Sequence, residues 1–206
     1  MEHPRGNRSE AECLLELAEG RELLPLADIR EVGLSRSVVT RLVRDGRLER
    51  VGRGLYRRPD APVGEHHDLV AVFARVNRAV LVLLSALRFH ELGTQQPSAV
   101  WIQLPARARV PKMEWPPLRV VRTRVEALFT EGVDWHEIGG IQVPITNPAR
   151  TVVDCFKHRS QVGLDVCLEA LRELVRRDRN AMDSLYWYAT INRVQHVMQP
   201  YLEGVV

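Results

Sequence analysis

The sequence lacks the features of membrane-spanning and secreted proteins. Its best apolar run, residues 79–84, is far shorter than the roughly 18 residues that cross a bilayer. The polar N-terminus lacks the apolar stretch of a signal peptide. The three cysteines are an odd number without CxxC spacing, which indicates reduced thiols rather than a disulfide framework or a zinc ribbon. We therefore expect a cytoplasmic protein that makes no contact with a membrane.

The sequence also has no glycine-rich phosphate loop. A metal-dependent nuclease of the acid-x-lysine type is disfavoured, because Val110 stands two positions before Lys112 and Cys155 two positions before Lys157. The sequence therefore gives no support for an enzyme that processes nucleic acid.

The sequence gives as little support for a catalytic triad or a metal site as it does for a nuclease. Ser85 and His90 lie at an i, i+5 offset, so they point apart on one helix. Cys155 and His158 are spaced to meet, but no further cysteine or histidine stands at ligand spacing, which favours an ordinary helix surface. We expect no catalytic residue, no metal and no cofactor.

What the sequence does have is an uneven distribution of charge. The formal net charge is only +3. Residues 10–31 nevertheless hold seven acids against two arginines, a balance of −5, and residues 34–58 hold eight arginines against two acids, a balance of +6. Such a swing between adjacent segments creates a local electric field even in a nearly neutral protein.

Three short helices are predicted in the first 45 residues. Ser9 with Glu12 has the spacing of a capping box, and Gly20 can end the helix that follows. A second helix is expected over residues 26–32 and a third from Ser35, the candidate N-cap, to about Asp45. This spacing is typical of a helix-turn-helix unit.

The third helix is strongly amphipathic. At about 100° per residue, its valines and leucine occupy one half of the helix, and its arginines and hydroxyl residues occupy the other. Two β-capable runs follow around Gly52-Arg53-Gly54, which predicts a hairpin. A helix-turn-helix followed by a small hairpin is a winged helix.

These elements predict a contact with double-stranded DNA. A recognition helix enters the major groove with its N-terminal polar residues at base edges, and arginine can grip guanine with two hydrogen bonds. The hairpin, or wing, would meet the minor groove or the DNA backbone. The predicted DNA-binding residues are Ser35, Arg36, Ser37, Thr40, Arg41, Arg44, Arg47, Arg50, Arg53, Arg57 and Arg58. Among these, Arg36, Ser37, Thr40 and Arg41 are placed for bases, and Arg44, Arg47, Arg57 and Arg58 for phosphates.

Two alternatives stand beside DNA binding. The basic winged helix can instead dock a protein partner, and an enzyme acting on nucleic acid is the third possibility. A second basic segment, the loop from Arg107 to Lys112, can contact DNA or a partner, although an ordinary solvated loop is the favoured interpretation.

The rest of the chain predicts a second, larger domain. Strands are expected near residues 80–83, 99–104, 118–122, 133–137 and 141–143, and helices follow from Asn147-Pro148 to the end. The predicted fold class is α+β, with an N-terminal winged helix-turn-helix and a C-terminal mixed α/β domain ending in helices. We expect domain one to cover residues 1–62 and domain two residues 63–206.

Three stretches together carry a family resemblance: residues 35–62 (SRSVVTRLVRDGRLERVGRGLYRRPDAP), 83–105 (LLSALRFHELGTQQPSAVWIQLP) and 145–173 (ITNPARTVVDCFKHRSQVGLDVCLEALRE). The first resembles the winged helix of AbiEi-type antitoxins of type IV toxin–antitoxin systems, and the other two resemble the C-terminal domain of the same proteins.

The resemblance implies a bacterial transcriptional autoregulator that binds inverted repeats in its own promoter. A homodimer on the DNA is a separate expectation, and the sequence leaves open whether the free protein is a monomer or a dimer. The resemblance also implies an antitoxin that neutralises a neighbouring nucleotidyltransferase-like toxin. The C-terminal domain of such proteins is tied to antitoxin activity and to cooperative DNA binding. Arg150, Thr151 and Asp154 fall within the similar motif and are possible antitoxin-motif residues, although the spacing of Arg150 and Asp154 is also that of a helix ion pair.

Overall fold

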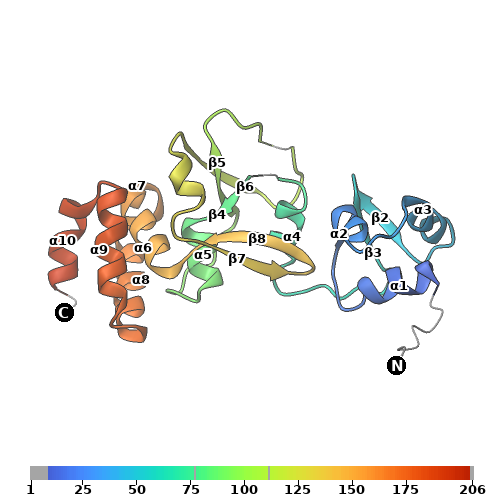
Figure 1. The fold of residues 1–206 in the computed structure, drawn as a ribbon. Helices are drawn as coiled ribbons and strands as arrows, with labels where there is room; N and C mark the ends of the chain where they lie inside the picture. Colours follow the sequence, from blue (N-terminus) through green and yellow to red (C-terminus); the bar gives the residue numbers. More distant parts are fainter. Residues whose placement is uncertain (1–8, 77, 111, 205–206) are drawn as a thin grey trace, which may run out of the picture. The chain divides into compact units, whose positions relative to one another are not determined.

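A computed structural model describes residues 9–76, 78–110 and 112–204 of the chain (Figure 1). Helices come first, two sheets follow, and further helices complete the chain, so the predicted α+β class is confirmed. None of the helices in the described ranges is long and apolar enough to span a membrane.

The chain forms two compact units. Unit one comprises the described residues up to Arg75 together with Glu137–Gln142, and unit two comprises Val76–His136 and the described residues from Val143 onward. Unit one therefore extends past the expected boundary at residue 62 and includes a second, distant segment. A functional boundary at residue 62 remains a prediction.

Unit one begins with three helices close to those predicted: α1 (Glu10–Leu17), α2 (Leu26–Glu31) and α3 (Arg36–Arg44). The capping box before α1 is present, because the Ser9 hydroxyl accepts from the Glu12 backbone and the Glu12 carboxylate accepts from the Ser9 backbone. Gly20, Gly33 and Gly46 follow the three helices with positive φ angles, a conformation that glycine adopts without steric cost.

The predicted wing is the pair β2 (Glu49–Gly52) and β3 (Leu55–Arg57), and α4 (His67–Phe73) follows it. A two-residue strand, β1 (Leu24–Pro25), pairs with the other side of β3, which gives the antiparallel order β1-β3-β2. One hydrophobic core holds the helices and this sheet together. It consists of Leu14, Ala18, Leu24, Ile29, Val38, Val39, Leu42, Leu48 and Tyr56.

The sheet of unit two has the order β6-β5-β4-β8-β7. Its strands are β4 (Val80–Leu81), β5 (Val100–Pro105), β6 (Leu118–Thr123), β7 (Val133–Ile138) and β8 (Ile141–Thr146). Strand β5 runs parallel to β6 and antiparallel to β4, and β4 runs parallel to β8. Strand β6 lies at the edge of the sheet, so among the described strands only β5 pairs with it.

Helices pack around this sheet and complete unit two. They are α5 (Leu83–Phe89), the short 3-10 helix η1 (Glu126–Phe129), α6 (Pro148–Lys157), α7 (Arg159–Val162), α8 (Leu164–Arg177), α9 (Ala181–Ile191) and α10 (Gln195–Glu203). Figure 1 shows α8, α9 and α10 grouped beside α6, and a shared apolar core joins them. The predicted start of α6 is confirmed, because the Asn147 side chain accepts from the Arg150 backbone and Pro148 takes the first helical position.

Candidate nucleic-acid interface

Helix α3 divides as the sequence predicts. Val38, Val39 and Leu42 are buried in the core of unit one. Each fully buried side chain of this kind contributes about 1.5–3 kcal/mol, which fixes the rotation of the helix about its axis. The opposite face is exposed to solvent and consists of Arg36, Ser37, Thr40, Arg41 and Arg44.

The wing is tied to the helix-turn-helix through its backbone. The amide of Leu26, the first residue of α2, donates to the Gly54 carbonyl at 2.8 Å. Gly54 has a φ of +72°, which places this carbonyl at the end of a tight turn. Arg53 is exposed at the tip of that turn, so its guanidinium is presented on a fixed support.

The arginines of this region fall into two groups. Four make hydrogen bonds within the protein. Arg57 donates to Glu49 at 2.9 Å across the hairpin, Arg50 to the Gly52 carbonyl at 3.2 Å, Arg44 to Asp45 at 3.3 Å, and Arg58 to Asp60.

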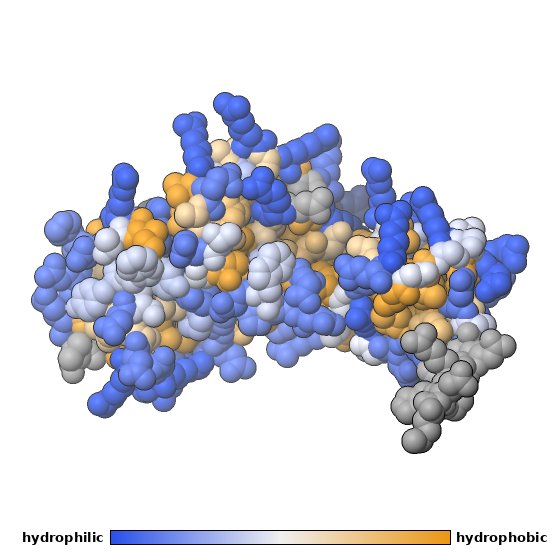
Figure 2. All heavy atoms as spheres, in the orientation of Figure 1, coloured by the Kyte–Doolittle hydropathy of each residue, from blue (hydrophilic) through white to orange (hydrophobic). Residues whose placement is uncertain are grey.

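The other four are exposed, and within the described residues no ion pair or hydrogen bond engages their guanidinium groups: Arg36, Arg41, Arg47 and Arg53. Figure 2 shows hydrophilic side chains at the end of unit one that carries α3, next to a hydrophobic patch. Unpaired guanidinium groups on both the helix and the wing are the arrangement that a duplex requires.

Arg58 and Asp60 form a two-bond pair after the wing, with distances of 2.9 and 2.7 Å. The side-chain hydrogen bonds between them raise the pKa of Arg58 and lower the pKa of Asp60. Asp60 therefore offsets the charge of Arg58, whose predicted phosphate contact stays a prediction.

Ser35 is the N-cap residue of α3, but its hydroxyl makes no capping bond. It lies 2.8 Å from the Ser37 hydroxyl and donates to the Glu10 carboxylate at 3.3 Å. Ser35 and Ser37 are thus oriented by α1 rather than by the helix they precede, and Glu10 brings one negative charge to the start of the basic face.

The possible antitoxin-motif residues lie in the interior of unit two. Arg150 is 1% exposed, Thr151 is fully buried and Asp154 is 5% exposed. The ion pair expected at i, i+4 is present, with Arg150 Nε donating to Asp154 Oδ2 at 2.9 Å.

Further contacts link this pair to two other parts of unit two. Arg150 donates to the carbonyls of Glu131 and Leu128 beside η1, and Asn192 after α9 donates to Asp154 at 2.9 Å. The Thr151 hydroxyl lies 2.7 Å from that of Thr146 at the end of β8. These residues are therefore positioned to hold α6 against its neighbours. Because they are buried, they can affect a partner only through the structure of unit two.

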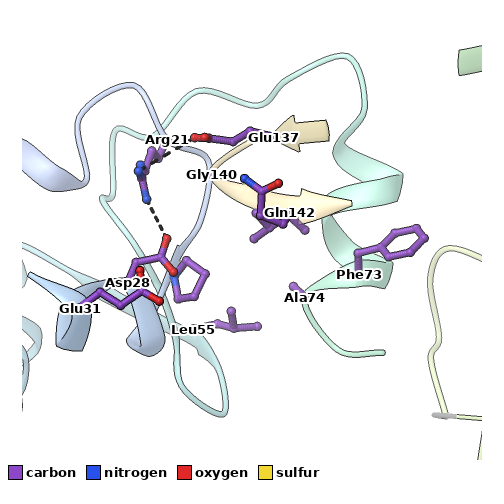
Figure 3. Close-up of a pocket in the computed structure, with 11 residues that line it drawn as sticks. Arg21, Asp28, Glu31, Leu55, Phe73, Ala74, Glu137, Gly140 and Gln142 are labelled. Atoms are coloured by element: carbon purple, nitrogen blue, oxygen red, sulfur yellow. Dashed lines mark hydrogen bonds and ion pairs between the residues drawn. The ribbon is translucent and has the colours of Figure 1, made fainter. Parts of the chain in front are cut away.

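Unit one contains a cavity of about 470 Å³ behind α2 and the start of β3 (Figure 3). Its apolar walls include Leu55 and Phe73. Arg21 donates to Asp28 at 2.8 Å and lies 4.0 Å from Glu137. With Glu31, the lining holds three acids against one arginine, so its net charge is negative. The eleven lining residues include no serine, threonine, cysteine or histidine, so they present no nucleophile of the kinds considered above.

The residues considered for catalysis do not converge. The Ser85 hydroxyl accepts from the Trp101 backbone at 2.9 Å, and His90 contacts the Thr146 carbonyl at 2.7 Å. Burial lowers the pKa of both His90 and His158. No group of three or more His, Cys, Asp or Glu side chains suited to a metal ion is found in the described part of the chain.

Unit one therefore has the architecture of a winged helix-turn-helix of the kind found in transcriptional regulators. Residues 14–59 match the protein-family model described as "Transcriptional regulator, AbiEi antitoxin". This match confirms the predicted resemblance over the three helices and the wing.

Two further comparisons concern the whole chain. No curated protein matches it significantly. Among solved structures it is similar to the RV2827C protein from Mycobacterium tuberculosis, with 17% identity, a TM-score of 0.48, and coverage of 97% of this chain and 82% of that one.

Proposed function

We propose that the protein is a cytoplasmic, DNA-binding transcriptional autoregulator that acts as the antitoxin of a type IV toxin–antitoxin pair. In this proposal a homodimer binds inverted repeats in its own promoter through the eleven residues predicted above. Its second role is to neutralise a nucleotidyltransferase-like toxin. The protein has no catalytic activity in this proposal and needs no cofactor.

The four unpaired arginines carry the proposal: Arg36 and Arg41 on α3, Arg47 just after it and Arg53 at the turn of the wing. They are exposed to solvent, and the hydrophobic core of unit one fixes the orientation of α3. The family match over residues 14–59 supports the regulator role independently of this charge pattern.

The test of DNA binding is a gel shift with the promoter fragment upstream of the gene, titrated with salt. If two chains each neutralise about four phosphates, log affinity falls against log salt with a slope of about −7. Arg41→Ala should weaken binding, and Arg172→Ala, an exposed arginine on α8, serves as the matched control. A salt-independent shift, or no shift, favours the protein-interaction alternative.

The antitoxin role needs its own test, because DNA binding does not imply it. Co-expression with the product of the adjacent gene should restore growth that this product arrests when expressed alone. Failure to restore growth reduces the protein to a plain repressor. Cleavage or modification of DNA or RNA by the purified protein with a divalent metal supports the enzyme alternative instead.

A further inference from the structure

The cavity of unit one, shown in Figure 3, takes no part in the function proposed above. Its volume of about 470 Å³ lies in the range of about 300–1,000 Å³ that is typical of sites for small organic molecules. Its walls come from α2, the start of β3, the end of α4 and the segment Glu137–Gln142, all within unit one. The bond from the Leu23 amide to the Gly139 carbonyl, at 2.8 Å, holds that segment in place. The cavity is therefore bounded by elements of a single folded unit.

Part of the cavity lining is apolar. Leu55 and Ile141 are 7% and 6% exposed, so the packing of unit one fixes both side chains. Pro25 and Ala74 extend this apolar surface. Apolar groups such as these stabilise a bound ligand by removing its hydrocarbon part from water. The lining therefore favours a ligand with an apolar body.

The charged part of the lining is acidic. The carboxylates of Asp28, Glu31 and Glu137 stand against a single guanidinium, that of Arg21, which gives a formal charge of −2. Arg21 already donates to Asp28 at 2.8 Å. In the part of the chain that the structure describes, no hydrogen bond or ion pair engages the Glu31 carboxylate. Figure 3 shows Asp28 and Glu31 on α2 and Ala74 across the cavity on α4, so a ligand between them meets carboxylates on one side and apolar surface on the other.

We propose that the cavity binds a small organic cation, in which an ammonium group is attached to an apolar body. An anionic ligand would be repelled by the carboxylates, because the one guanidinium in the lining already donates to Asp28. A metal ion would leave the apolar surface in contact with water, and within the described residues these carboxylates do not form a group suited to a metal ion. An ammonium group near Glu31 and a ring or alkyl chain against Leu55 and Ile141 match both parts of the lining. This inference does not depend on DNA binding.

The test is a titration of the nitrogen-15-labelled full chain with tryptamine, followed by the NMR chemical shifts of the backbone amides. Tryptamine carries an ammonium group on a short arm from an indole ring. Indole-3-propionate, which carries a carboxylate on the same arm and ring, is the matched anion. Tryptamine should bind with a dissociation constant of about 1 mM or lower. The largest shifts should fall on residues of the lining, and indole-3-propionate should cause none there.

Two double substitutions test the role of the carboxylates. Glu31→Gln/Glu137→Gln removes two charges from the lining and keeps the size of the side chains, so the affinity for tryptamine should fall about fivefold or more. Glu19→Gln/Glu65→Gln is the matched control, because it removes the same charge from exposed positions of unit one outside the lining. The control should bind tryptamine as the wild type does. Equal affinities of the two variants would contradict the proposal.

A third substitution, Ala74→Leu, tests the location of the site by filling the cavity. Ala74 has helical backbone angles, which leucine adopts readily, so this variant should fold and lose tryptamine binding. Should circular dichroism show that it is unfolded, Gln142→Trp decides instead, because Gln142 is exposed and lines the same cavity. Absence of binding to the wild type, equal shifts with indole-3-propionate, or undiminished binding to a folded filling variant refutes the proposal.

Discussion

The buried pair of Arg150 and Asp154 gives the sharpest prediction about unit two. Asp154 accepts two hydrogen bonds, from Arg150 Nε and from Asn192 Nδ2, both at 2.9 Å. Substitution Asp154→Asn leaves one carbonyl oxygen for these two donors and turns an amide toward one of them. It also leaves a guanidinium that is 1% exposed without its counter-ion.

The expected cost follows from this geometry. Removing one partner of a buried ion pair destabilises a protein by about 3–5 kcal/mol. Arg150 keeps its two carbonyl acceptors beside η1, so we expect about 3 kcal/mol, at the lower end of that range. For a chain of 206 residues this corresponds to a fall in melting temperature of about 6–12 °C.

The assay is urea denaturation followed by circular dichroism, with Glu126→Gln as the control. Glu126 also pairs with an arginine, but the side chains of that pair are 65% and 72% exposed. Its loss should therefore cost about 0.5 kcal/mol or less. A loss below about 1 kcal/mol for Asp154→Asn would refute the reasoning.

A double substitution isolates the role of charge. Arg150→Met/Asp154→Leu removes both charges and keeps similar volume, so it should be more stable than Asp154→Asn alone. If its free energy of unfolding instead falls by the sum of the single losses, packing rather than charge explains the effect.

Three further predictions concern separate regions. Arg36→Ala or Arg41→Ala should cost about 1–3 kcal/mol of binding to the specific site and relax its sequence preference, whereas Arg57→Ala should weaken binding evenly across duplexes; competition gel shifts measure both. Burial raises the pKa of Cys167 to about 12 and also raises the pKa of Cys155. Iodoacetamide at pH 8 should therefore label Cys13 in the native protein and the two buried thiols only after unfolding, which mass spectrometry can measure. Hydrogen bonds from the Gly93 amide and from Arg177 lower the pKa of Glu173, so the stability that Glu173 contributes should be present at neutral pH and lost as the pH falls through that lowered pKa. Glu173→Gln should therefore flatten this part of the profile of unfolding free energy against pH. An unchanged profile would contradict the assignment.

The sequence predicts most accurately what short-range patterns determine. The capping box at Ser9, the two faces of α3 and the wing around Arg53 each depend on residues within about ten positions of one another. For these elements, periodicity and turn chemistry contain nearly all the necessary information.

Contacts between residues far apart in the sequence cannot be predicted from such short-range patterns. Strand β1 has two residues, and it exists because Leu24 and Pro25 meet β3 some thirty residues later. The segment Glu137–Gln142 joins unit one through the bond from the Leu23 amide to the Gly139 carbonyl at 2.8 Å. No local signal marks either contact.

Short-range patterns also do not predict which charged side chains are buried. The spacing of Arg150 and Asp154 is the same on a solvated helix as on a buried one, so the sequence predicts the ion pair and leaves its surroundings open. Glu22 belongs to the acidic stretch that begins at residue 10, yet it is 5% exposed and accepts from the Gly64 amide and contacts His67. Only the fold distinguishes such residues from their solvated neighbours.

The eight arginines of residues 34–58 likewise differ in whether they are paired within the protein. Counting them predicts a basic surface, but it does not tell which of them are available to a ligand. Those bonded within the wing and its flanks, such as Arg50 and Arg57, brace the hairpin. These hydrogen bonds stabilise the hairpin whose turn carries Arg53, so the bonded arginines help to position an unpaired one. The four unpaired guanidinium groups are therefore available to DNA without the loss of an internal bond, whereas Arg57 has to exchange its bond to Glu49 for one to a phosphate.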